Sequence, residues 1–219
     1  MAAAYPVLPQ SRTLWTFQKD QLPFVRSPSF DLGIWARTLS PALRMRFAAR
    51  AAEPLEVDET FERRDLDIVL GALSAVGDAE LEAFLRDELQ QLLPVFDATL
   101  NASHFRVRLD RVADNMCEKL HTDCLKLRLA CTYAGPGTEW VDDADADRGM
   151  LARADLTVDD ANAAVLRHSD ALQRCGIGDV ILLKGSEWNE SEQGAIHRSP
   201  QFTGQGRILL RIDEPETRP

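Results

Sequence analysis

A histidine and an aspartate flank a single residue in the stretch CEKLHTDCLKLRL, and a second histidine lies far downstream. Because side chains alternate along a strand, His121 and Asp123 would point to the same face. His197 follows in GAIHRSP, 74 residues after Asp123. Two imidazoles and one carboxylate on the inner wall of a barrel are the donor set of non-haem iron(II), which leaves coordination positions open. The plainer interpretation is that these are ordinary polar residues of a strand.

A downstream arginine could complete such a site. Arg207 lies ten residues after His197 in GQGRILLRID, and on a strand it shares a face with Leu209 and Arg211. A guanidinium binds a carboxylate through two parallel hydrogen bonds, which suits the distal end of a dicarboxylic acid. The spacing therefore links a metal site to a co-substrate site. Alternatively, Arg207 pairs with an acidic neighbour at the surface.

This order of residues resembles the signature of the iron(II)- and 2-oxoglutarate-dependent oxygenases. Within that superfamily, the sequence resembles the prolyl-hydroxylase-like branch most. The stretch RLACTYAGPGTEW resembles the run of that branch from an arginine to a tyrosine, followed by Gly-Gly-Glu-Thr and an aromatic residue. The resemblance covers roughly the last half of the chain. It implies a double-stranded β-helix in which His121, Asp123 and His197 hold Fe(II), while Arg207 binds the distal carboxylate of 2-oxoglutarate.

The same resemblance implies hydroxylation of a small-molecule or protein side-chain substrate. Tyr133 could donate a hydrogen bond to the co-substrate, or it could be a buried tyrosine bonded to a backbone carbonyl. The whole sequence is also similar to an uncharacterised bacterial family of unknown function.

The cysteines permit a different kind of site. Cys117, His121 and Cys124 recur at three- and four-residue spacing, which would place them on one face of a helix. With Cys131 or Cys175 as the fourth ligand, they would form a closed tetrahedral zinc site, and the protein would handle metal without catalysis. A barrel that binds a metal without turnover is a further alternative, because a fold alone does not confer chemistry.

The two halves of the chain differ in the elements that would position these residues. Residues 1–102 are predicted to be helical. Ser40 is a plausible cap for a helix that starts at Pro41, and the run DAELEAFLRDELQQLL, which begins at Asp78, repeats leucines at helical spacing until Pro94 closes it. Because such apolar stripes mostly serve core packing, we expect these helices to pack on the second half.

Residues 103–219 contain short runs with strand character, such as HFRVRLDRV, LKLRLACTY, DVILLKG and GRILLRID. Runs of this length between glycine, proline and acidic turns predict an antiparallel barrel or jelly roll. Lys126 and Arg128 would face solvent unless the barrel reverses the sense of the strand. The pattern thus predicts an α+β protein with an α-helical N-terminal region, and the resemblance makes the C-terminal region a double-stranded β-helix.

Charge and hydropathy limit the partners. The chain has 35 acidic and 25 basic residues, with a net charge of −10, so its surface repels phosphate backbones and anionic lipids. We therefore expect neither nucleic acid nor a membrane as a partner. No apolar run is long enough for a membrane span, and the first residues lack the basic start of a signal peptide. These features predict a cytoplasmic protein with reduced thiols.

Overall fold

The computed structural model describes residues 11–113, 117–189, 193–201, 204 and 206–215. Strands and helices alternate along the chain, with several short 3-10 helices (η) between them. In chain order the elements are β1 (Thr13–Thr16), η1 (Lys19–Arg26), β2 (Leu32–Trp35), α1 (Pro41–Arg50), β3 (Glu56–Glu62), α2 (Asp67–Ala72), η2 (Leu73–Val76), α3 (Ala79–Leu100), β4 (His104–Val112), β5 (Leu127–Ala134), β6 (Glu139–Val141), η3 (Asp143–Asp145), η4 (Arg148–Met150), α4 (Val158–Val165), β7 (Leu172–Arg174), β8 (Val180–Lys184), β9 (Ile196–Arg198) and β10 (Arg207–Asp213).

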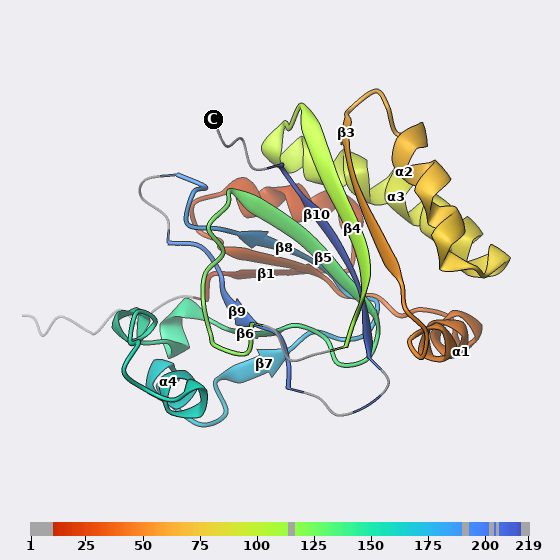
Figure 1. Ribbon diagram of the computed structural model, residues 1–219. Helices are drawn as coiled ribbons and strands as arrows, with labels where there is room; N and C mark the ends of the chain where they lie inside the picture. The colour runs from red at the N-terminus through yellow and green to blue at the C-terminus, as the bar shows by residue number, and fades with distance from the viewer. Residues whose placement is uncertain (1–10, 114–116, 190–192, 202–203, 205, 216–219) are drawn as a thin grey trace, which may run out of the picture.

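The strands form two sheets. The large sheet has seven strands in the order β1-β2-β8-β5-β10-β4-β3, and the small sheet has three in the order β7-β6-β9. Strand β1 is parallel to β2, whereas the other pairs in both sheets are antiparallel. Figure 1 shows α2 and α3 beside the large sheet, with the small sheet and α4 at a distance from these helices. The protein is thus a mixed α/β structure built around a large, mostly antiparallel sheet.

Alternation along the strands gives the large sheet two different faces. Leu129 and Cys131 of β5 belong to the main apolar core, which they share with the helices, whereas Ala130 belongs to a second core with Trp140 of the small sheet. Near its end β5 contains a β-bulge: Ala134 and Thr132 pair with consecutive residues of β10. The face that carries Ala130 and Thr132 is therefore the one that meets the small sheet.

Residues 1–102 were predicted to be helical, but three of their segments, β1, β2 and β3, are strands. β2 pairs with β8, β1 extends that edge, and β3 forms the opposite edge beside β4. The acidic composition of β3 concealed its strand character, because Asp and Glu are depleted in strands. The partner strand supplies the compensating charge, since Arg106 of β4 forms two hydrogen bonds with Asp58 of β3.

The predicted helix starts are confirmed, but one predicted end is wrong. The Ser40 hydroxyl accepts a hydrogen bond from the Leu43 N–H at 3.3 Å, and Asp78 accepts from two N–H groups at the start of α3. Helix α3 continues through Pro94 to Leu100. Residues on both sides of the proline, including Leu92 and Phe96, are buried in the main core, and this packing offsets the lost helical hydrogen bond. No helix in the described part of the chain is long and apolar enough to cross a membrane.

Candidate metal centre

The two histidines face each other across an antiparallel bridge. The His121 N–H donates to the His197 carbonyl at 3.0 Å, and the His197 N–H donates to the His121 carbonyl at 2.9 Å. Their ring centroids are 4.6 Å apart. His197 belongs to β9, so the bridge places His121 beside the small sheet. Asp123 lies two residues further along and brings its carboxylate to the same place.

The three side chains could hold one metal ion. Nε2 of His121 lies 3.6 Å from Oδ1 of Asp123, and Nε2 of His197 lies 3.4 Å from Oδ2. All three candidate ligand atoms lie within 4.8 Å of one another. Among the described residues, this is the one group of three or more His, Cys, Asp or Glu side chains close enough to share an ion.

Backbone carbonyls fix the orientation of both rings. Nδ1 of His121 is 2.8 Å from the Lys119 carbonyl, and Nδ1 of His197 is 3.1 Å from the Ala195 carbonyl. Because a carbonyl only accepts, each Nδ1 carries the hydrogen, and a neutral ring then keeps its lone pair on Nε2. This is the tautomer that a metal-ligating histidine uses when its other nitrogen donates to a carbonyl. The donor set therefore fits a metal ion.

Neighbouring segments hold the His121 stretch in place. The buried side chain of Asn162 in α4 accepts from the Leu120 N–H at 2.6 Å and donates to the Glu118 carbonyl at 2.9 Å. On the other side, the Ser186 N–H donates to the Asp123 carbonyl at 2.9 Å. A Cβ atom on Gly185 would lie 2.0 Å from the Leu125 carbonyl oxygen, so only glycine permits this close approach.

The carboxylate of Asp123 is held in its charged form. Burial alone would raise its pKa, but hydrogen bonds from the Nε2–H groups that His121 and His197 carry when their rings are protonated, and the charges of His197 and Arg128, together place the pKa well below its ordinary value. The hydrogen bond with Asp123 raises the pKa of His121, burial opposes this, and the Lys119 carbonyl adds to the rise. The metal-free site is thus a cluster of complementary charges.

Arg207 is buried and has no carboxylate partner among the described residues. It is 1% exposed and donates from Nη2 to the hydroxyls of Thr132 at 2.8 Å and Thr138 at 2.7 Å. Burial lowers its pKa to about 10. A buried guanidinium is normally paired, because removing an unpaired charge from water is costly. Arg207 is therefore a candidate anion-binding residue.

One cavity connects the metal cluster with Arg207. Its volume is about 70 Å³. Its lining includes His121, His197, Thr138 and Arg207. The two candidate ligand rings and the guanidinium thus border the same cavity.

A family model described as "Protein of unknown function (DUF1826)" matches residues 18–213. The chain belongs to the DUF1826 family. No curated protein gives a significant match.

Solved structures resemble this DUF1826 chain at low sequence identity. Dioxygenase for auxin oxidation 1 from Arabidopsis thaliana, in its complex with 2-oxoglutarate, is 9% identical with a TM-score of 0.52, covering 94% of this chain and 92% of its own. The rice dioxygenase for auxin oxidation is 12% identical with a TM-score of 0.49 and coverages of 94% and 83%. A full-length Neurospora crassa protein in complex with alpha-KG is 9% identical with a TM-score of 0.42 and coverages of 97% and 86%. The likeness to the Arabidopsis enzyme shows the fold alone.

Tyr133 does not lie with the other predicted site residues. Its ring stacks on Phe47 with centroids 4.7 Å apart, and its hydroxyl donates to Glu88 at 3.2 Å. These contacts lie in the core shared with α1 and α3, on the face of β5 opposite to Thr132. Burial raises the pKa of Tyr133 well above its ordinary value. The prediction of Tyr133 as a co-substrate ligand is therefore wrong, because alternation directs its side chain away from the cavity.

Two hydroxyl residues and one arginine of this DUF1826 chain were missed by the sequence interpretation. Thr132 and Thr138 are the hydrogen-bond partners of Arg207. Arg128 was expected to face solvent unless its face of the strand pointed into the barrel. The structure shows the second arrangement, because Arg128 contacts Asp123. The alternation that excludes Tyr133 also groups Arg128 with Thr132, so this signal was present in the sequence.

Of the four cysteines, Cys117 lines the cavity of His121 and His197, but no thiol joins the group of candidate ligand atoms that the described residues form. Cys117 and Cys124 are exposed, whereas Cys131 and Cys175 are buried in two separate apolar clusters. Burial raises the pKa of the Cys131 thiol to about 12 and that of Cys175 still higher, which disfavours the thiolates that zinc requires. The described residues contain no cysteine-bearing group that could hold a metal.

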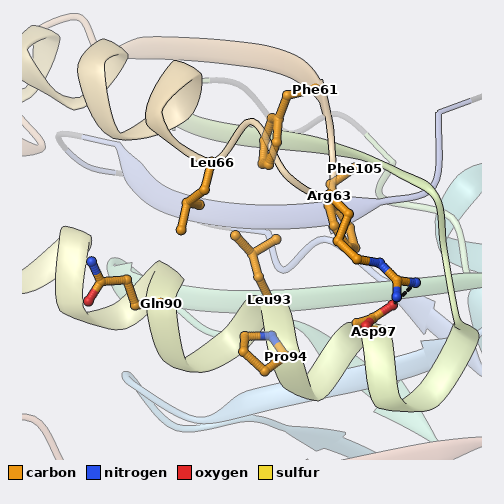
Figure 2. A pocket seen from close by; sticks show the side chains of 8 residues that line it. All are labelled: Phe61, Arg63, Leu66, Gln90, Leu93, Pro94, Asp97 and Phe105. Carbon is orange, nitrogen blue, oxygen red and sulfur yellow. Dashed lines mark ion pairs between the residues drawn. The ribbon is translucent and has the colours of Figure 1, made fainter.

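A second pocket lies between α3, the end of β3 and β4, away from the metal cluster. Figure 2 shows its apolar walls and, at one end, the ion pair of Arg63 with Asp97, whose nearest atoms are 2.5 Å apart. The lining consists of Phe61, Arg63, Leu66, Gln90, Leu93, Pro94, Asp97 and Phe105. It contains no histidine or cysteine, whereas the two candidate histidine ligands line the cavity of Arg207.

Proposed function

We propose that this protein is an iron(II)- and 2-oxoglutarate-dependent oxygenase and that its two facing sheets form a double-stranded β-helix. The observation that carries the proposal is the joint lining of one cavity by His121, His197 and the buried Arg207, which has no acidic partner among the described residues. The fold of a dioxygenase that binds 2-oxoglutarate supports it. The strand order also supports the β-helix, because after β5 the chain crosses between the sheets: β6, β7 and β9 lie in the small sheet, and β8 and β10 lie in the large one.

The residues of the chain take distinct roles in this proposal. His121, Asp123 and His197 would hold the metal through Nε2 and carboxylate oxygen atoms. Arg207, oriented by Thr132 and Thr138, would bind the distal carboxylate of 2-oxoglutarate through its planar fork. The bound metal and co-substrate would supply the electrons that activate dioxygen, the oxidant for hydroxylation of an unreactive C–H bond. The protein would exclude water and orient a small molecule or a protein side chain.

Anaerobic titration tests this function. The wild-type protein should bind one Fe(II) per chain, and 2-oxoglutarate should then bind to the iron-loaded protein. Replacing His197 with Ala should abolish stoichiometric iron binding, because two ligands hold the ion far more weakly than three. Circular dichroism should show that the variant remains folded.

The same titration distinguishes the alternatives. Iron binding without any 2-oxoglutarate binding at millimolar concentration would favour a non-catalytic metal protein. Tight zinc binding that is lost in a Cys117→Ser, Cys124→Ser double variant would favour a zinc-handling protein instead. We expect the double variant to keep its metal, because its thiols are exposed and do not join the histidine cluster.

A further inference from the structure

Arg128 connects the metal cluster to the last strand of the large sheet. Its Nη1 donates to Oδ2 of Asp123 at 2.7 Å, and its Nε donates to Oδ1 of Asp213 at 2.8 Å. Nη2 adds a longer bond of 3.2 Å to Oδ2 of Asp213. The Arg128 side chain is 18% exposed and that of Asp123 is 12% exposed. One guanidinium therefore bridges two largely buried carboxylates.

We propose that Arg128 is a positioning residue that presents Asp123 to the metal through a single oxygen. This inference rests on the proposed function of the site. Arg128 donates to Oδ2 of Asp123, which also lies 3.4 Å from Nε2 of His197, whereas Oδ1 faces Nε2 of His121 and has no bond to Arg128. A carboxylate with one oxygen held by a strong charge-assisted bond has the other oxygen free for an ion. A carboxylate that bound the metal through both oxygens would take one more coordination position, and that position then remains open.

The bridge has a rigid anchor. Asp213 is 4% exposed, lies on β10 and also accepts a hydrogen bond from Arg108 of β4. The carboxylate that orients Arg128 is thus fixed from two sides. Arg207 begins the same strand, so β10 carries both the proposed co-substrate arginine and the anchor of the metal carboxylate.

Only arginine can make both connections at once. A planar guanidinium places its donors in a fixed fork, so Nη1 and Nε reach two different carboxylates. A lysine ammonium keeps the positive charge but is a compact point charge. Arg128→Lys therefore separates geometry from charge: it retains the electrostatic effect on Asp123 but loses the simultaneous bond to Asp213.

Anaerobic titration with Co(II) tests the proposal, because the visible spectrum of Co(II) reports its coordination. Arg128→Gln should bind Co(II) about 10- to 100-fold more weakly than wild type, the usual effect of losing a partner of a metal ligand. The visible bands should also change. Arg128→Lys should show the same changes. The matched control is Arg108→Gln, which breaks a bond to the same anchor but none to Asp123, and should retain the wild-type spectrum.

Each result has a definite meaning. An Arg128→Gln protein with the affinity and spectrum of wild type would overturn the proposal, as would full rescue by Arg128→Lys. Absence of Co(II) and Fe(II) binding in the wild type would instead overturn the proposed function itself. If Arg128→Gln fails to fold, Asp213→Asn provides the second test. It removes the charge of the anchor and leaves the ligands intact, and it should shift the spectrum in the same direction.

Discussion

The guanidinium of Arg207 is the clearest residue-scale feature of the cavity, because its hydrogen-bond partners are two neutral hydroxyls. Arg207→Ala should weaken 2-oxoglutarate binding by about tenfold to a few hundredfold, since a charge-assisted hydrogen bond contributes about 1.5 to 3 kcal/mol. Iron binding should remain. Calorimetric titration of the iron-loaded proteins measures the change.

Arg211 provides the control for that measurement. It lies on the same face of β10, four residues further along, and its guanidinium is already paired with Asp110. Arg211→Ala should therefore change 2-oxoglutarate affinity little. An equal loss in both variants would show that general positive charge, and not the position of Arg207, determines binding.

Tyr133 gives the opposite expectation. Tyr133→Phe removes a hydroxyl that donates to Glu88, while Glu88 keeps its ion pair with Arg37. The free energy of unfolding should fall by about 1.5 to 3 kcal/mol, the range for a hydrogen bond to a charged group. Affinity for 2-oxoglutarate should be unchanged because the ring lies on the far face of β5. Urea unfolding and calorimetry check the two halves of this prediction, and a lower affinity in a stably folded variant would contradict the second.

At the scale of elements, α3 contains a defect that can be repaired. Pro94 has no N–H to donate to the Gln90 carbonyl, and Figure 2 shows its ring at the wall of the second pocket. An interior proline disfavours a helix by about 3 kcal/mol, and its rigidity in the unfolded chain returns only about 0.4 to 1 kcal/mol. After the loss of ring contacts, Pro94→Ala should raise the free energy of unfolding by about 1 to 2 kcal/mol.

Pro41 is the matched control for Pro94. It occupies the first position of α1, where a helix has no acceptor for the missing N–H. Pro41→Ala should leave stability unchanged or slightly lower, measured by the same urea unfolding. A loss of stability in Pro94→Ala would mean that the ring's packing outweighs the hydrogen bond that alanine restores.

The sequence predicted the long helices and strands because their apolar and polar residues repeat several times at helical or strand spacing. HFRVRLDRV alternates through nine residues and coincides with β4. By contrast, β1 and β2 have four residues each, so only two side chains mark each face. Their strand character comes from partners that a local pattern does not contain. For β2 that partner is β8, far along the chain.

The site was predictable only in part for a similar reason. The spacing of His121, Asp123 and His197 indicated a shared site, and the structure brings these three side chains together. The two histidines line one cavity with Arg207. The contact between Arg128 and Asp123 depends on which face of β5 turns inward. Local alternation identifies two faces but does not say which of them meets the small sheet.

At the scale of the whole molecule, the first hundred residues and the rest form one packing unit. β3 and β2 pair directly with β4 and β8, and α3 supplies much of the main core. A fragment of residues 103–219 would lose these partners and expose two sheet edges. We expect it to show no cooperative urea unfolding, in contrast to the full chain. A sharp transition in the fragment would show that the C-terminal region folds alone.

Strand β10 lies between β4 and β5, although both precede it in the chain. During synthesis, the ribosome therefore completes β4 and β5 while the middle of the sheet is still open. Their unpaired edges can associate wrongly until β10 is released, which makes this the aggregation-prone interval of biosynthesis. The strand that closes the gap also delivers Arg207 and Asp213. A chain without β10 therefore lacks both the strand between β4 and β5 and the arginine that lines the cavity.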